Sequence, residues 1–148
     1  VSACIMTDKK GGHWLQTIYY PFYYFANYAK GTVMQTISRG PVYSCQDFEK
    51  VPYVDSLVVL NDSNNELVFF AVNRDEAKEQ MVSIQVQGLM LNSVIESINM
   101  TAKDKKMNNK NVHDAVKPKI NNKVKLNKEK IDIILAPLSF NVVRISVE

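Results

Sequence analysis

The amino-acid sequence predicts a mainly β fold, in which an antiparallel β-sandwich follows one short βα unit. Two observations predict the sandwich: short apolar stretches recur along the chain, and clusters of turn-forming residues separate them. A third observation, an apolar segment that follows Pro21 and stops before Gly31, predicts the helix. With 148 residues, of which 46% are hydrophobic, the chain can form one domain with a substantial core.

The βα unit comes first. Residues 3–6 are expected to end a buried strand, and the polar, glycine-bearing residues 8–12 to form a loop. Pro21 suits the first turn of a helix, where its missing N–H is not needed. The helix should cover residues 22–28 and end at residues 30–31, where a lysine is a favourable last-turn cation and a glycine a suitable C-cap.

The pattern changes period after residue 32. We expect strands at 56–60 and 66–73, joined by the turn-forming cluster 61–65. A further strand is expected at 81–87, after the polar residues 74–79. Here the apolar side chains alternate with polar ones, which indicates one buried and one exposed face, and they are Val82, Ile84 and Val86. The three strands are predicted to form an antiparallel meander.

Four more strands complete the prediction: 94–99, a short one at 123–126, then 131–135 and 142–147, which residues 136–138 separate. The segment between the first two is a weakly patterned excursion.

That excursion is rich in lysine. Residues 101–130 contain ten lysines against Asp104, Asp114 and Glu129, whereas the whole chain carries a net charge of only +3. Such a stretch invites a nucleic-acid interpretation. However, it has no arginine and no aromatic residue, so it offers neither forked donors nor stacking surfaces. We expect a solvated loop and no nucleic-acid partner.

Cofactor and metal sites are not predicted. The two cysteines, Cys4 and Cys45, show no zinc-ligand spacing and fit a reducing compartment, although a single bridge stays open. His13 and His113 are interpreted as loop and surface residues. Two pairs of carboxylates are interpreted as solvated: Asp75 with Glu76, and Asp47 with Glu49. No apolar run of the roughly 20 residues that a bilayer requires is present.

The order of local motifs adds a family resemblance. The sequence resembles the C-terminal part of glycoside hydrolase family 51 over most of its length outside the lysine-rich excursion. Two runs are the most specific: Gln-Thr-Ile-Tyr-Tyr-Pro-Phe at 16–22 and Phe-Ala-Val-Asn-Arg at 70–74. The similarity also includes 4–7, Gly11 with Gly12, Trp14, 28–31, 41–43, 47–48, 51–55 and 138–144. The chain departs from the family at Cys4, where proline is usual, and at Phe140, where tryptophan is usual.

This resemblance implies that residues 1–31 are the last strand, loop and helix of a (β/α)8 barrel and that residues 32–148 are a jelly-roll-like sandwich. It implies a parent α-L-arabinofuranosidase, a retaining hydrolase that removes terminal arabinofuranosyl groups from arabinan or arabinoxylan oligosaccharides. Its two catalytic glutamates, about 5–5.5 Å apart in retaining enzymes, would lie upstream of this chain. The chain begins with Val1 and is interpreted as a fragment that is inactive alone.

The resemblance also implies two substrate-binding residues. Gln16 matches the family glutamine that hydrogen-bonds the furanose ring, and an uncharged amide offers both donors and an acceptor to hydroxyl groups. Trp14 could present an apolar face to a sugar or to the leaving group. The alternatives are a polar residue at the start of a helix for Gln16 and loop packing for Trp14. Five tyrosines at helical spacing are interpreted as packing residues rather than a sugar platform, and they are Tyr19, Tyr20, Tyr23, Tyr24 and Tyr28.

Three functions are weighed. In the favoured one, the chain is a mainly structural C-terminal domain of a cytoplasmic arabinofuranosidase, whose partners are the missing barrel, an arabinofuranosyl oligosaccharide and, in one version, further copies in a homo-oligomer. The second is a free-standing carbohydrate-binding module, which is disfavoured because no aromatic triplet alternates along a strand. The third is a nucleic-acid binder.

Overall fold

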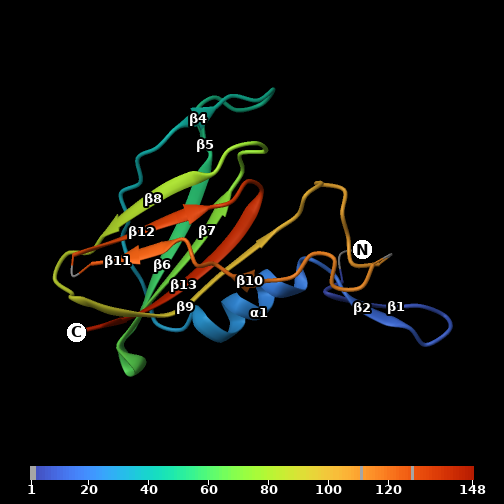
Figure 1. The fold of residues 1–148 in the computed structure, drawn as a ribbon, viewed down its shortest axis with the longest axis horizontal. Helices are drawn as coiled ribbons and strands as arrows, with labels where there is room; N and C mark the ends of the chain where they lie inside the picture. The colour runs from blue at the N-terminus through green and yellow to red at the C-terminus, as the bar shows by residue number, and fades with distance from the viewer. Residues whose placement is uncertain (1–2, 111, 128) are drawn as a thin grey trace.

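The computed structural model describes residues 3–110, 112–127 and 129–148. The chain forms three layers: a three-stranded sheet, a six-stranded sheet and the helix α1 (Tyr19–Tyr28) (Figure 1). All strand pairs are antiparallel. The predicted antiparallel sandwich is therefore confirmed.

The larger sheet is built around its C-terminal strand. In order across the sheet, its strands are β10 (Lys119–Ile120), β9 (Leu91–Thr101), β13 (Ser139–Val147), β7 (Glu66–Asn73), β6 (Val54–Asn61) and β3 (Thr32–Val33). β13 and β7 occupy the centre, and nearly all their side chains are buried. They are rich in valine, isoleucine and phenylalanine, residues that pack well on a pleated surface.

The smaller sheet covers one face of the larger one. Its order is β11 (Val124–Leu126), β12 (Lys130–Leu135) and β8 (Gln80–Gln85). Ile131, Ile133 and Leu135 of β12 point inward and pack against Leu67 and Val143 of the larger sheet. Val82, Ile84 and Val86 pack against the same core, so the predicted alternation is confirmed.

Helix α1 covers the opposite face. Tyr24 is buried there with Phe70, Phe140 and Val142, and Tyr20 and Tyr28 pack against the same cluster. Positions 20, 24 and 28 are four residues apart, which places them on one side of a helix. The expected packing role of the tyrosines is thus confirmed for these three.

The predicted single strand before the helix is a hairpin. β1 (Ile5–Thr7) pairs with β2 (His13–Leu15), and the loop between them contains the predicted residues 8–12. β1 is half exposed in this chain, so the expected burial is wrong. The remaining elements are the β4 (Val42–Tyr43) and β5 (Val51–Pro52) ribbon, which projects from the body (Figure 1), and the short helix η1 (Asp62–Asn64).

Two further predictions are wrong: the place of β8 in a meander and the C-terminal cap of α1. β8 does not continue a meander beside β7, because it crosses to the smaller sheet and pairs with β12, while β7 pairs with β13. The helix ends at the C-cap Ala29, so neither Lys30 nor Gly31 has its predicted capping position. Gly31 is required for another reason: a Cβ atom there would lie 2.1 Å from the carbonyl oxygen of Leu60.

Asp75 is also not the solvated carboxylate that we expected, since it is 8% exposed. Its carboxylate accepts hydrogen bonds from the backbone N–H groups of Ala77 and Lys78, which lower its pKa. The neighbouring Asn73 amide donates to the carbonyl groups of Lys78, Leu135 and Ala136. These bonds join the end of β7 to the β12–β13 turn.

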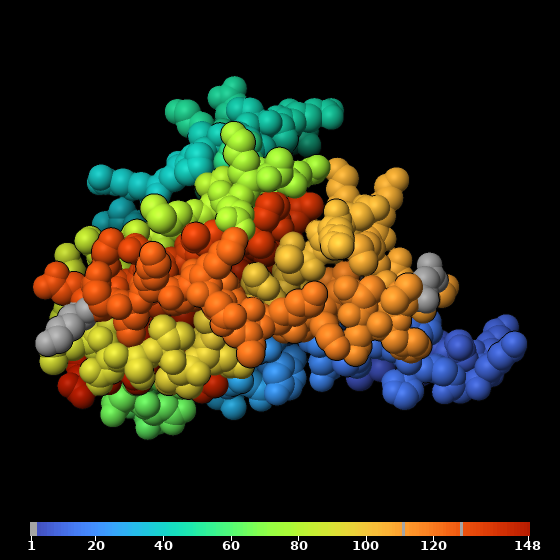
Figure 2. All heavy atoms as spheres, viewed as in Figure 1, coloured from blue at the N-terminus to red at the C-terminus, as the bar shows by residue number. Residues whose placement is uncertain are grey.

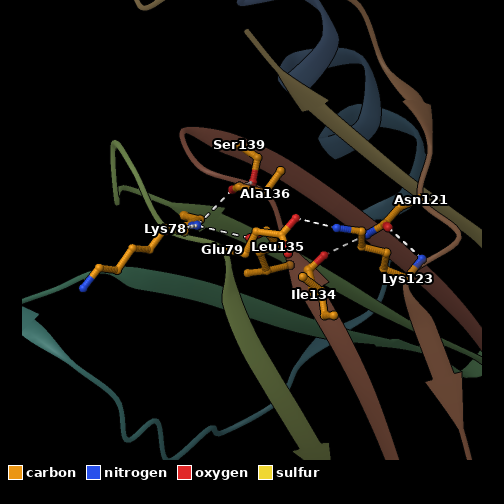
Figure 3. Close-up of polar contacts among 9 residues, drawn as sticks. Lys78, Glu79, Asn121, Lys123, Ile134, Leu135, Ala136 and Ser139 are labelled. Carbon is orange, nitrogen blue, oxygen red and sulfur yellow. Dashed lines mark hydrogen bonds and ion pairs between the residues drawn. The ribbon is translucent and has the colours of Figure 1, made fainter. Parts of the chain in front are cut away.

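Asparagine side chains also fix the loops near β12. Asn121 donates to the carbonyl oxygen of Ile134 at 3.2 Å and accepts from the backbone N–H of Lys123 at 3.0 Å (Figure 3). Ser139 closes the neighbouring β12–β13 turn by donating to the Ala136 carbonyl oxygen (Figure 3). Asn121, which is 6% exposed, thus adds a buried polar anchor to the lysine-rich excursion.

Candidate substrate-binding site

A cavity of about 470 Å³ lies between the N-terminal hairpin and the lysine-rich excursion. Its lining comes from two parts of the chain that are far apart in sequence. The residues are Met6, Thr7, Asp8, Lys9, Trp14, Gln16 and Thr17 from the N-terminal unit, and Asn108, Asn109 and Lys110 from the excursion. Both residues predicted to bind substrate, Trp14 and Gln16, line this cavity.

The hairpin places Trp14 and Gln16 together. Trp14 lies opposite Met6 in the register of β1 and β2, and side chains two residues apart along a strand point to the same side. The backbone of Gln16 is held at both ends: its N–H donates to Cys4 at 2.9 Å, and its carbonyl oxygen accepts from Tyr19 at 2.9 Å. Gln16 therefore stands at a fixed junction between β2 and α1, with its side chain half buried.

Asn109 holds the second wall in place and is a residue that the sequence-based prediction missed. It is 2% exposed. Its amide nitrogen donates to the carbonyl oxygens of Leu15 at 3.1 Å and Val116 at 2.9 Å, and its oxygen accepts from the Val116 N–H at 2.8 Å. The excursion is thus not a solvated loop along its whole length. The apolar pair Ala115–Val116 was the signal that could have indicated this contact.

The cavity has a mixed polar and weakly basic character. Lys9 and Lys110 contribute cations, and Asp8 is the one carboxylate among the described lining residues. One Asp8 carboxylate oxygen already accepts hydrogen bonds from the backbone N–H groups of Lys10 and Gly12. Amides, a hydroxyl, ammonium groups and an indole face can bind a neutral polyol. Hydrolysis by a pair of carboxylates would need groups that these residues do not provide.

A second hollow of about 330 Å³ lies nearby on α1. It is lined by Tyr19, Tyr20, Tyr23, Tyr24, Lys117 and Pro118. The rings of Tyr19 and Tyr23 are stacked at 6.1 Å and are not part of the apolar cluster under the helix. Burial and then the Asp114 carboxylate raise the pKa of Tyr20.

The other sequence candidates lie outside both hollows. His13 and His113 are exposed, as are Glu76, Asp47 and Glu49. Cys4 and Cys45 are free thiols. In the described part of the chain, no group of three or more histidine, cysteine or acidic residues could hold a metal ion. Nor does any described helix have the length and apolar character needed to cross a bilayer.

Comparison with known proteins agrees with this architecture. Residues 1–139 match the family described as the alpha-L-arabinofuranosidase C-terminal domain. The chain is 34% identical over 146 residues to the intracellular exo-alpha-(1->5)-L-arabinofuranosidase 1 of Bacillus subtilis, and 31% identical over 146 residues to the corresponding protein of Acetivibrio thermocellus. Each match covers 98% of this chain and 29% of the relative.

Solved structures share the fold across both the N-terminal unit and the sandwich. A family 51 alpha-L-arabinofuranosidase from Bifidobacterium longum has a TM-score of 0.88 and 25% identity, and the match covers 97% of this chain and 28% of that one. The GH51 arabinofuranosidase from Xanthomonas axonopodis has a TM-score of 0.85 at 24% identity, with the same coverage. The family match spans nearly the whole sequence, and the chain belongs to the alpha-L-arabinofuranosidase C-terminal domain family.

Proposed function

We propose that this chain is the C-terminal part of an α-L-arabinofuranosidase that removes terminal α-L-arabinofuranosyl residues from arabinan or arabinoxylan oligosaccharides with retention. The chain spans 29% of the length of the relatives described above, and both are named as arabinofuranosidases. The observation that carries the proposal is the cavity in which the hairpin brings Trp14 and Gln16 together. The cavity supplies binding groups but no pair of catalytic carboxylates, which is what we expect of one part of an arabinofuranosidase active site.

We propose the boundary between the two structural units at residues 31–32. The hairpin and α1 would complete the catalytic barrel, and the segment from Thr32 onward would form the sandwich. Thr32 is the first residue of β3, which already belongs to the larger sheet. In this arrangement α1 serves both units, because its Tyr24 side packs on the sandwich and its opposite side exposes Phe22, which is 60% exposed here.

The catalytic glutamates would lie in the barrel outside this chain, so the isolated chain is expected to be inactive. Two of the relatives are named intracellular, which supports a cytoplasmic location for the parent enzyme. Its partners would be the arabinofuranosyl oligosaccharide and the barrel, with assembly into a homo-oligomer as a further proposal.

The proposal is tested with the full-length protein and 4-nitrophenyl α-L-arabinofuranoside. We expect turnover by the full-length protein, none by residues 1–148 alone, and loss of folded, active protein when 32–148 are removed. Replacing Gln16 with alanine should lower kcat/KM about tenfold, the effect of a lost hydrogen bond. Gln85→Ala, at an exposed position of β8, is the control. Full activity of the truncated barrel would contradict the structural role.

A carbohydrate-binding module remains the second candidate, and the tyrosine-lined hollow favours it. Aromatic faces beside polar groups are suited to sugar rings. In that case the isolated chain should bind arabino-oligosaccharides in calorimetry, and Tyr23→Ala should abolish the heat of binding. Absence of heat at millimolar ligand would eliminate this alternative.

A further inference from the structure

The lysine-rich excursion contacts the proposed substrate site directly. Its segment between β9 and β10 lies against the N-terminal hairpin, in orange beside blue in Figure 2. This contact joins residues more than ninety positions apart. A loop of the sandwich therefore forms one wall of the cavity.

The wall is held at a specific point. Asn109 donates to the carbonyl oxygen of Leu15, the residue between Trp14 and Gln16. The same amide makes two bonds to Val116, which closes the loop on itself. A buried amide with three hydrogen bonds fixes its neighbours in space, since breaking them would leave buried polar groups unsatisfied. Asn108 and Lys110 are consequently held across the cavity from Gln16.

These neighbours present free binding groups. The Lys110 ammonium makes no ion pair with any described residue, whereas Lys105, Lys117 and Lys123 of the same excursion pair with Glu76, Asp114 and Glu79. The Asn108 oxygen accepts from the Lys110 N–H at 3.0 Å, and its amide nitrogen donates to the Lys106 carbonyl oxygen at 3.5 Å, which leaves one amide N–H for a ligand. An ammonium and an amide offer several donors to hydroxyl oxygens.

We propose that Asn108 and Lys110 bind the leaving-group side of the oligosaccharide, and that Asn109 is the positioning residue for both. This inference rests on the proposed function. If Gln16 binds the terminal furanose, groups across a cavity of about 470 Å³ are placed to reach the next sugar unit. That volume is within the range of small-ligand sites and exceeds the size of a single pentose. The sandwich then contributes to the choice of substrate.

The test compares two substrates in the full-length enzyme: an α-1,5-linked arabinotriose and 4-nitrophenyl α-L-arabinofuranoside, which has no second sugar. Lys110→Ala and Asn108→Ala should each lower kcat/KM for the triose about three- to tenfold, mainly through KM, and change the value for the aryl substrate by less than about twofold. Lys106→Ala is the matched control, since this exposed lysine lies in the same loop and does not line the cavity.

Asn109→Ala should give the same selective loss for the triose, because it releases the wall rather than removing a contact. Thermal unfolding identifies any variant that fails to fold, and the exposed Lys110→Ala keeps the proposal testable in that case. Equal losses on both substrates, or no loss on the triose, would overturn the inference. Turnover of neither substrate by the unchanged enzyme would instead overturn the proposed function on which it rests.

Discussion

At the scale of single residues, Arg144 links three other side chains of this chain. It lies on β13 and donates to both carboxylate oxygens of Glu66, which is 4% exposed. It also approaches Glu96 at 3.4 Å, and its guanidinium carbon lies 4.1 Å from the centre of the Tyr28 ring. Arg144 thus connects the sheet to the C-terminal turn of α1, and the hydrogen bonds that it donates to Glu66 raise its pKa.

Removing this cation should destabilise the chain strongly. Arg144→Met leaves the Glu66 carboxylate buried without its partner, which typically costs about 3 kcal/mol or more. Arg144→Lys should recover part of that loss, since it keeps the charge and loses the two-pronged geometry. Urea unfolding measures both. The double variant Glu66→Leu with Arg144→Met should be more stable than Arg144→Met alone; if it is not, the loss does not arise from the uncompensated charge.

The lowered pKa of the Asp75 carboxylate predicts that the stability of the folded chain depends on pH. Hydrogen bonds from Ala77 and Lys78 lower its pKa in the folded chain, while the unfolded chain has the ordinary value of about 4. A lowered folded-state pKa gives stability that is present above the unfolded pKa and lost as the pH falls through the folded one. Asp75→Asn should therefore lower the thermal midpoint at pH 7, and the difference from the unchanged chain should narrow below about pH 4. A difference that stays constant from pH 7 to pH 3 would contradict this.

The same residues indicate what a sequence reveals at this scale. Gln16 and Trp14 could be found because they belong to a recognisable run at 14–22. The apolar pair Ala115–Val116 indicates that part of the excursion is buried, but it does not identify Asn109, because an asparagine among lysines has the same local signature whether it is solvated or buried. Its role depends on Leu15, a residue that only the folded chain brings near. Asp75 was misjudged for the same reason.

At the scale of elements, the link between α1 and β3 depends on one glycine. Gly31 has a φ of +135°, and a Cβ atom there would lie 2.1 Å from the backbone oxygen of Leu60. Gly31→Ala should cost several kcal/mol, on the order of 3, since both the backbone conformation and the close approach of β6 oppose it. The unfolding midpoint of the purified chain measures this.

Gly40→Ala is the matched control for that substitution. Gly40 has no atom within 4 Å of an added Cβ and no positive φ. Its replacement should be neutral or slightly stabilising, because alanine restricts the unfolded chain more than glycine does. Similar losses at both positions would show that the close approach to β6 is not the cause.

The strands themselves were predictable and their partners were not. Alternation in 81–87 identified a half-buried strand, and the runs at 66–73 and 131–135 identified buried ones. Strand pairing could not be predicted in the same way, because alternation indicates which side of a strand is buried and not which strand pairs with it. β8 could therefore be found from its pattern while its crossing to the smaller sheet could not. The hairpin partner β2 was missed because three residues are too few for a period to be visible.

At the scale of the whole molecule, α1 is a shared layer rather than an appendage. Its inner side belongs to the same apolar cluster as Phe70 and Phe140, and Phe25 stacks on Phe70 with ring centres 4.3 Å apart. The helix that the resemblance assigns to the barrel thus packs on the sandwich through several aromatic rings.

The outer side of α1 gives the last prediction. Phe22, Ile18 and Ile5 are 60%, 39% and 53% exposed in this chain, and the proposed barrel would cover them. Phe22→Ala should then leave the stability of the isolated chain within about 0.5 kcal/mol of its original value. In the full-length protein the same change should cost about 3 kcal/mol or more, because it removes a buried aromatic ring. Met81→Ala is the control: Met81 is 73% exposed on the edge strand β8, in the layer farthest from α1, and should be neutral in both forms. Unfolding midpoints of the two variants, each measured in both forms, test the prediction, since an equal effect of Phe22→Ala in the two forms would mean that no barrel rests on this face.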